Sequence, residues 1–171
     1  EFNRLLSSVT SAYGEPELEE TVTSIIPKQK QQSISKKNYH LITNEKEIDE
    51  WINEAEEAGE LAIDTETSSL DAHQADLIGI SLSTKIGKAC YIPIGHKFKG
   101  CLRKEAVIKK LKPLLEDKSV KKIGQNIKFD FIILFKQGIN MNSMEDTMLM
   151  SYVLDAGKNR HNMDTLSEIH L

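Results

Sequence analysis

Apolar residues recur with two different periods along this chain, and the change of period predicts its elements. Apolar and polar side chains alternate over 61–65, which is typical of a strand with one buried face, and 77–83 and 89–92 are predicted as the next two strands. We expect these three strands to be antiparallel neighbours joined by turns. Two more strands are predicted, a short one at 39–43 and a core strand at 120–123.

Helical spacing of apolar residues accounts for the segments between and after these strands. Asn44 and Glu47 form a capping-box pattern in front of an amphipathic helix, and Gly59 is a typical C-terminal stop. A second helix is predicted over 105–115. Pro113 lies inside it and is expected to mark an early end, because proline cannot donate a helical hydrogen bond.

A third helix is expected to begin at Asn126. Its buried side is predicted to consist of Phe129, Ile132, Ile133 and Phe135. Two further helices are predicted over 146–154 and 164–169, with Asp146 and Asp164 as N-terminal caps. Strands at the beginning, followed by alternation of strands and helices, indicate a mixed α/β sheet flanked by helices.

The first part of the chain has a different character. Residues 10–37 show little periodicity and pass from an acidic run into one rich in lysine and glutamine. We therefore predict a flexible interdomain tether over 1–38 and one globular domain over 39–171. Because the chain does not begin with methionine, we expect it to be a piece of a longer protein.

Composition narrows the class of protein. Hydrophobic residues make up 39% and charged residues 28%, and no apolar run reaches the ~18–20 residues of a membrane span. The spacing of Cys90 and Cys101 fits no zinc motif, which favours reduced thiols and a cytoplasmic protein. The net charge of −4 argues against a general duplex-DNA binder. Basic residues gather over 97–122 and acidic ones over 44–76, which suits a partner held at a basic side beside an acidic pocket.

Two carboxylates stand at the end of the strand predicted at 61–65. Asp64 and Glu66 are two residues apart, so on a strand they point to one face, roughly 6.5–7 Å apart along it. Such carboxylates repel each other, and desolvation raises the cost. A divalent cation removes that cost, and oxygen ligands are what magnesium and manganese require. The spacing therefore predicts a metal site.

Asp130 is the candidate third ligand. It follows Asn126 by four residues, so both are expected on one face of the helix that Asn126 begins. That position can face the strand that carries Asp64 and Glu66. Three carboxylates from two distant segments can hold two divalent cations, which activate water and stabilise the leaving oxygen. The alternative for Asp130 alone is an exposed first-turn acid favoured by the helix dipole.

The residues around these carboxylates resemble a known family. Two strings carry the likeness, Asp64-Thr65-Glu66-Thr67-x-x-Leu70 and Gly124-Gln125-Asn126-x-Lys128-Phe129-Asp130. In this order and separation they resemble the 3′–5′ proofreading exonuclease domain of bacterial DNA polymerase I, of the DEDD superfamily. The likeness extends over roughly 39–171. It implies a ribonuclease-H-like exonuclease fold, a polymerase domain in the same parent chain, and a role in DNA replication and repair.

The resemblance also implies roles for single residues. Asp64 would bridge two Mg²⁺ or Mn²⁺ ions, Glu66 would ligate the first, and Asp130 would hold the second. The residues expected to contact the single-stranded 3′ end of DNA are Thr67, Leu70, Gln125, Asn126 and Phe129. Phe129 stands where the family commonly has tyrosine, so it keeps a ring for base stacking without the hydroxyl. Core packing is the alternative interpretation for Leu70 and Phe129.

One part of the family pattern is not found. The third motif, Tyr-x-x-x-Asp on a later helix, supplies the last metal ligand and a tyrosine that orients the attacking water. After Asp130 the sequence offers Tyr152, with Asp155 at the wrong spacing. We therefore expect the domain to be incomplete at its C-terminal side, to bind metal weakly, to be nearly inert on DNA, and to self-associate through exposed apolar surface. Asp155 and His161 are expected to be structural.

Two other functions stay open at this point. One is a ribonuclease-D-like RNA exonuclease, which shares the Asp-x-Glu strand. The other is a degenerate module that scaffolds a polymerase or binds single strands. The string from Gln125 to Asp130 favours the polymerase type, and retention of the three carboxylates argues against decay.

Overall fold

The computed structural model describes residues 7, 10–11, 38–97 and 99–171 of the chain. Its contacts divide the chain into the units Glu1–Gln32 and Ser33–Leu171, and every element below belongs to the second unit. The tether predicted over 1–38 lies almost entirely outside the described residues. Within them, no helix is long and apolar enough to cross a lipid bilayer.

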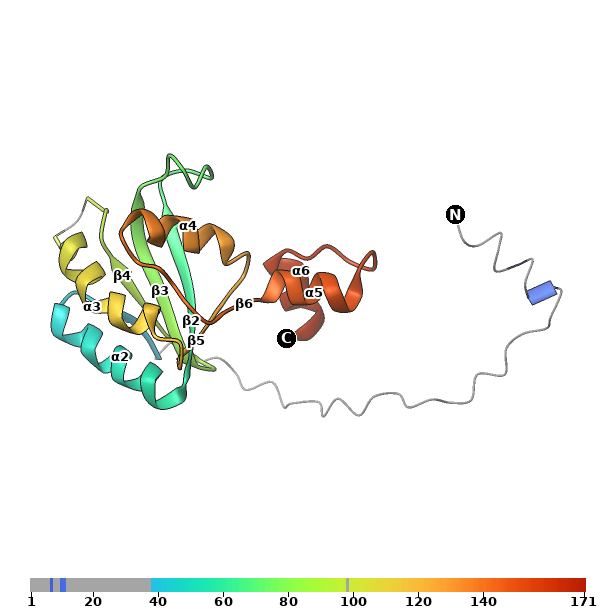
Figure 1. Ribbon diagram of the computed structural model, residues 1–171, viewed down its shortest axis with the longest axis horizontal. Helices are drawn as coiled ribbons and strands as arrows, with labels where there is room; N and C mark the ends of the chain where they lie inside the picture. Colours follow the sequence, from blue (N-terminus) through green and yellow to red (C-terminus); the bar gives the residue numbers. More distant parts are fainter. Residues whose placement is uncertain (1–6, 8–9, 12–37, 98) are drawn as a thin grey trace. The chain divides into compact units, whose positions relative to one another are not determined.

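A mixed sheet of six strands forms the centre of the second unit, in the order β1-β4-β3-β2-β5-β6 (Figure 1). The strands are β1 (Tyr39–Leu41), β2 (Glu60–Thr67), β3 (Leu77–Lys85), β4 (Lys88–Pro93), β5 (Lys121–Gly124) and β6 (Met144–Asp146). Strand β3 is antiparallel to β2 and β4, as predicted, and the other described pairs are parallel. Strands β2, β5 and β6 therefore end at the same edge of the sheet.

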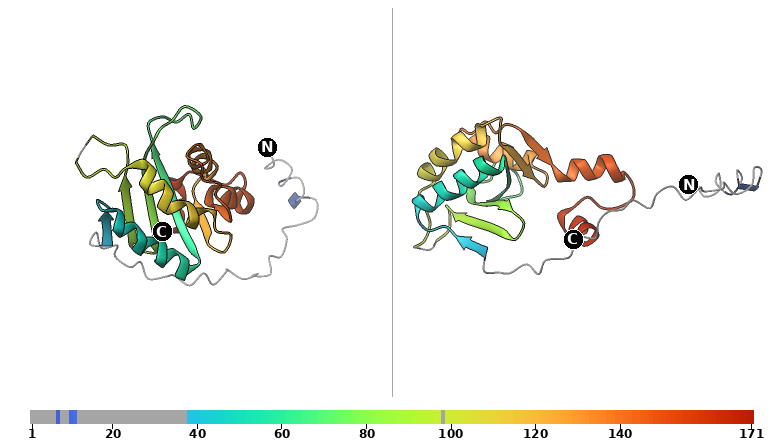
Figure 2. Two further views of the ribbon diagram at one scale, coloured as in Figure 1. Left: turned by 60° about the vertical axis from the view of Figure 1, so that its left-hand side comes forward. Right: turned by 90° about the horizontal axis from the view of Figure 1, so that it is seen from below.

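In the part of the chain that the structure describes, five helices accompany this sheet: α2 (Glu45–Ala58), α3 (Lys104–Glu116), α4 (Lys128–Lys136), α5 (Thr147–Asp155) and α6 (Met163–His170). Along β2 the side chains of Leu61, Ile63 and Thr65 are buried, whereas Asp64 and Glu66 on the opposite face are exposed. The side chains of the buried face form one core with residues of α2, α3 and α4, the helices that accompany the sheet in the ribbon views of Figure 2. The α/β sheet with flanking helices is confirmed, and these three helices cover the face that carries the core.

The capping residues in the sequence predicted the limits of α2 correctly, whereas the proline inside α3 was misleading. The Asn44 side chain accepts a hydrogen bond from the Lys46 amide at 3.0 Å, and Gly59 ends α2 in the left-handed conformation with φ 71°. The early end predicted for α3 at Pro113 is wrong, because the helix continues to Glu116. Proline costs only one hydrogen bond in this last turn, while the apolar side of α3 stays buried in the core.

The start of α4 differs from the prediction in a way that affects the site. Asn126 has a φ of 57° and so cannot belong to the helix, which begins at Lys128. The expectation that Asn126 and Asp130 share a helical face is therefore wrong. Asp130 nevertheless lies among the buried residues of α4. Phe135, predicted to be buried, is 59% exposed, because α4 buries Leu134 beside it instead.

The last elements were only partly predicted. Strand β6 was missed, since three residues show no periodicity. Asp146 caps α5 as expected, but α6 is capped by Asn162, whose side chain accepts a hydrogen bond from the Thr165 amide. Asp164, predicted as that cap, lies inside the first turn of α6.

One lysine of the basic segment does not contribute to a basic surface. Lys122 is fully buried, and its ammonium group donates hydrogen bonds to the backbone oxygens of Asp117 and Val120 at 2.5 and 2.6 Å. These carbonyl partners offset the cost of burying the charge. Any basic surface over 97–122 must therefore come from the other lysines and Arg103.

Candidate active site

Asp64 and Glu66 lie near the end of β2 on its exposed face, as the spacing predicted. Opposite them on β3 stand Ser81 and Gly79, so no bulky neighbour covers the carboxylates from that strand. Partial burial raises the pKa of Asp64, and the nearby Glu66 carboxylate raises it further. The Glu66 carboxylate thus disfavours the charge of Asp64, which is the electrostatic situation that a cation relieves.

Asp130 approaches β2 from α4 and is 2% exposed. Its Oδ1 accepts hydrogen bonds from the Thr65 amide at 2.8 Å and from the Thr65 hydroxyl at 2.6 Å. Burial raises the pKa of Asp130 to about 6; the two Thr65 donors lower it in part, and the charge of Asp64 adds to the increase. The predicted proximity of Asp130 to the strand of Asp64 and Glu66 is confirmed.

The three carboxylates reach the strand end from two sides. Asp64 and Glu66 point from the exposed face of β2, while Asp130 bonds Thr65, whose side chain belongs to the buried face. Among the described residues, no group of three or more His, Cys, Asp or Glu side chains is arranged to hold a metal ion. The donor chemistry fits a hard cation, because all three side chains are carboxylates. Burial and a neighbouring carboxylate raise the pKa of Asp64 and of Asp130, and a cation would offset this cost of their charge.

A groove of about 600 Å³ opens at this point, between the end of β2 and the start of α4. It brings together every residue that the sequence suggested for the site, along with three neighbours from the strand and the following loop. Its lining consists of Asp64, Thr65, Glu66, Thr67, Ser68, Ser69, Leu70, Gln125, Asn126, Phe129 and Asp130.

The structure separates the two apolar candidates. Leu70 is 97% exposed, which excludes core packing and leaves an apolar side chain at the rim of the groove. Phe129 is partly buried and packs against the core while it also lines the groove. Thr67, which also lines the groove, donates its hydroxyl proton to the Ser69 carbonyl oxygen at 2.9 Å.

Gln125 has partners that the sequence did not suggest. Its amide nitrogen donates to the His161 carbonyl oxygen at 2.7 Å, and its amide oxygen accepts from the Thr147 hydroxyl at 2.5 Å. His161 is buried and hydrogen-bonded through Nδ1 to the Ser151 hydroxyl at 2.7 Å, which confirms its structural interpretation. The Gln125 side chain therefore connects the groove to the segment around α5 and α6.

Thr65 is the residue that sequence reasoning missed. It occupies the buried position that follows Leu61 and Ile63 in the alternation of β2, where an apolar residue is the norm. A polar side chain at such a position needs a partner, because a buried hydroxyl without one is costly. That mismatch was a usable signal, and Asp130 is the partner.

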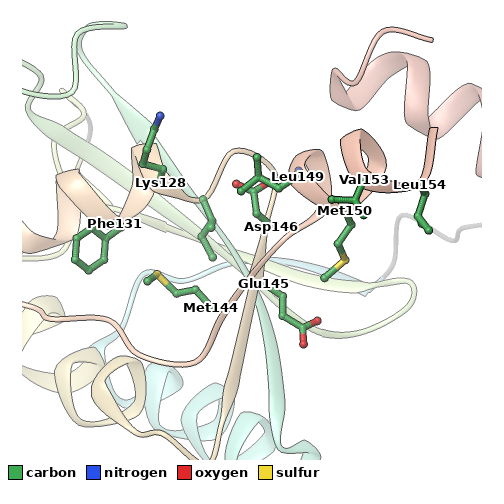
Figure 3. A pocket seen from close by; sticks show the side chains of 10 residues that line it. Lys128, Phe131, Met144, Glu145, Asp146, Leu149, Met150, Val153 and Leu154 are labelled. Atoms are coloured by element: carbon green, nitrogen blue, oxygen red, sulfur yellow. Dashed lines mark hydrogen bonds between the residues drawn. The ribbon is translucent and has the colours of Figure 1, made fainter. Parts of the chain in front are cut away.

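A second, apolar groove of about 720 Å³ lies between α4, β6 and α5. Figure 3 shows the side chains that line it, among them Phe131, Met144, Leu149 and Val153. Within the described residues, α5 and α6 have no buried side chain. The expected exposed apolar surface is therefore confirmed, while self-association stays a prediction.

The sheet order, the carboxylates at the end of β2 and the aspartate on α4 together define a ribonuclease-H-like exonuclease fold. A family model described as 3′–5′ exonuclease matches residues 39–171, and the chain belongs to this family.

Two similar proteins are DNA polymerases I. That of Rhizobium leguminosarum is 45% identical over 142 residues, which cover 71% of this chain and 14% of the relative. That of Pseudomonas aeruginosa is 41% identical over 136 residues, covering 76% of this chain and 15% of the relative. The chain therefore spans about one seventh of the length of these relatives.

A solved structure with the same fold is Brucella melitensis NrnC bound to pGG. It superposes with a TM-score of 0.58 and is 26% identical, and the match covers 78% of this chain and 60% of NrnC. The same protein has been solved with bound Mg²⁺, with a TM-score of 0.54, 25% identity, and coverage of 74% of this chain and 57% of NrnC.

Proposed function

We propose that this chain is the proofreading exonuclease domain of a DNA polymerase I, and that within its parent protein it hydrolyses the terminal phosphodiester at the 3′ end of single-stranded DNA. The observation that carries the proposal is the groove in which Asp64, Glu66 and Asp130 meet residues suited to hold a nucleotide. The family match and the identity of 41–45% to DNA polymerases I support the choice of DNA as substrate.

We propose that two divalent cations, Mg²⁺ or Mn²⁺, act with these carboxylates. Asp64 and Glu66 would hold them from the exposed face of β2, and Asp130 would contribute from α4. When bound, the cations supply activation of water and neutralisation of charge at the scissile phosphate. Thr65 fixes one oxygen of Asp130 and so leaves the other as the one available to a ligand.

The rest of the groove would bind the terminal nucleotides. The Phe129 ring, which lines the groove, would stack on a base, a contact worth ~1–3 kcal/mol, and the exposed Leu70 would contact the terminal base from the rim. Thr67, Gln125 and Asn126 would supply polar contacts. Because both ends of the Gln125 amide are hydrogen-bonded within the chain, a contact from Gln125 requires those bonds to be shared or exchanged.

The proposal extends to the surroundings of the domain. A polymerase domain of the same parent chain would deliver frayed 3′ ends, and the parent would act in the cytoplasm in DNA replication and repair. A ribonuclease-D-like activity is the enzymatic alternative, and a purely structural module is the non-enzymatic one.

The test compares matched DNA and RNA strands with the parent protein that carries this chain. A 5′-labelled single strand should shorten from its 3′ end in Mg²⁺, and DNA should be degraded faster than RNA of the same sequence. Faster degradation of RNA would support the ribonuclease-D-like alternative. No shortening of either strand would support the structural module.

A further inference from the structure

One buried aspartate outside the proposed ligand set connects the groove to the next helix. Asp146 is 9% exposed, and a single oxygen, Oδ1, accepts hydrogen bonds from three backbone amides. Two of them, from Met148 and Leu149 at 2.9 and 3.3 Å, belong to the first turn of α5. The third, at 3.0 Å, comes from Asn126, which lines the groove twenty residues earlier in the chain.

Asn126 has an unusual backbone conformation within the loop between β5 and α4. A φ of 57° is uncommon for a residue other than glycine, although asparagine tolerates it better than most. The Asn126 carbonyl oxygen then accepts the Phe129 amide at 2.9 Å as α4 begins. The conformation of Asn126 therefore determines the direction in which α4 leaves the sheet, and with it the position of Asp130.

The loop has little room to adopt another path. A side chain at Gly124 would place its Cβ 2.9 Å from Cγ1 of Ile127, so the turn depends on glycine there. Gly124 also pairs with Asp146 in the register of β5 and β6. Asp146 thus holds the loop at both ends, through its backbone pairing with Gly124 and through its side-chain hydrogen bond with Asn126.

Thr147, next to Asp146, makes a second connection to this loop. Its hydroxyl lies 2.5 Å from the Gln125 amide oxygen and 3.2 Å from the Gly124 carbonyl oxygen. A hydroxyl has one proton to donate, so it serves one of these acceptors at a time. The shorter contact orients the Gln125 amide and turns its nitrogen toward the His161 carbonyl oxygen at 2.7 Å.

We propose that Asp146 and Thr147 are positioning residues of the exonuclease site. They act through the loop 124–126, which they hold so that Asn126 faces the groove and α4 presents Phe129 and Asp130 to it. This inference rests on the proposed function. A helix cap alone requires the two amides of α5 and gives no reason for the bond to Asn126.

The same chain offers a matched control for a cap without this connection. Asn44 caps α2 by accepting the Lys46 amide at 3.0 Å, and it does not line the groove. Removing that cap should loosen the start of α2 and leave the loop 124–126 unchanged. Removing the Asp146 carboxylate should change both α5 and the loop.

The test uses the full 171-residue chain with two readouts. Amide hydrogen exchange at Asn126 and Thr65, followed by NMR, reports the loop and the contact with Asp130. Fluorescence anisotropy of a 5′-labelled single-stranded oligodeoxynucleotide in Ca²⁺ reports the groove. Asp146→Ala should speed exchange at Asn126 and weaken binding about tenfold, the loss expected for one hydrogen bond to a charged group.

Conservative variants separate positioning from general stability. Asp146→Asn keeps an oxygen that can accept the Asn126 amide and should restore both readouts, and Asn44→Ala should change neither. If Asp146→Ala fails to fold, Thr147→Val and Thr147→Ser take the place of Asp146→Ala and Asp146→Asn. Weaker binding of the single strand is then expected only for Thr147→Val.

Three results would contradict the positioning role of Asp146. Unchanged exchange at Asn126 in Asp146→Ala, or faster exchange with unchanged affinity, would overturn the positioning role. An equal effect of Asn44→Ala would overturn it as well. If the wild-type chain binds no single strand in the anisotropy measurement, that result counts against the proposed function. Amide exchange at Thr65 still decides whether Asp146 positions Asp130.

Discussion

Replacing Asp130 by asparagine should make the domain more stable at neutral pH while it removes the proposed function. Asparagine has the same shape, and its Oδ1 can accept the same two hydrogen bonds from Thr65. The substitution therefore removes a buried negative charge while both Thr65 donors keep their acceptor. Stability and activity should change in opposite directions, as is common where a site holds an unfavourable charge.

The magnitude follows from the pKa of Asp130, which is about 6 against an ordinary value of 3.8. A raised pKa means that the folded state prefers the protonated acid. The contribution of Asp130 to the stability of the fold is therefore fully present below about pH 4 and is lost as the pH rises through about 6. At about 1.36 kcal/mol per pH unit, the cost of ionisation in the folded state at pH 7.5 is about 3 kcal/mol.

The assay is thermal unfolding in EDTA at a series of pH values. At pH 7.5, Asp130→Asn should unfold about 6–12 °C above wild type, given roughly 2–4 °C per kcal/mol for a chain of this size. The difference should shrink steadily below pH 6 and vanish near pH 3.5. Asp76→Asn is the control, because Asp76 is exposed and does not line the groove, and it should show no such dependence.

Added Mg²⁺ supplies the second arm of this experiment. Wild type should gain stability from a cation that neutralises Asp130, and Asp130→Asn should gain less. A variant that is less stable than wild type at pH 7.5 in EDTA, or a difference that does not depend on pH, would refute the claim that Asp130 is a buried, unfavourably charged carboxylate.

Three further outcomes follow from the burial of single residues. Leu70→Ala should weaken binding of a single strand in Ca²⁺ and leave the melting temperature unchanged, since Leu70 is 97% exposed; a lower melting temperature would contradict its place at the rim. Phe129→Ala should lower both, with a loss of affinity that corresponds to ~1–3 kcal/mol of stacking, and unchanged affinity would return Phe129 to the core alone. Burial raises the pKa of the Cys90 thiol to about 12, so a thiol reagent at pH 8 should modify Cys101 first, as mass spectrometry of the digested protein would show; early modification of Cys90 would contradict this burial.

The sequence was sufficient where a structural feature depends on neighbours along the chain. The faces of Asp64 and Glu66 follow from the period of two in β2, which any strand imposes on its side chains. The cap at Asn44 and the stop at Gly59 are equally local. These features were predicted because a few consecutive residues determine them.

The remaining features depend on partners far along the chain. Asn126 adopts a left-handed conformation beside Asp146, twenty residues later, and helical spacing alone therefore predicted the wrong start for α4. The role of Thr65 depends on Asp130, which the sequence places sixty-five residues away. Strand β6 exists through its pairing with β5 and has too few residues for a period of its own.

The central claim is that Asp64, with Glu66 and Asp130, carries out hydrolysis at the 3′ end of DNA. Its most direct test is the rate at which the parent protein shortens a 5′-labelled single strand in Mg²⁺, for wild type, Asp64→Ala and the control Asp76→Asn. We predict that Asp64→Ala loses more than about 100-fold in rate, since first ligands matter more than the outer partners that cost 10–100-fold, while it keeps the melting temperature of wild type within a few degrees and the control keeps full activity. Undiminished shortening by a folded Asp64→Ala protein would contradict the assignment.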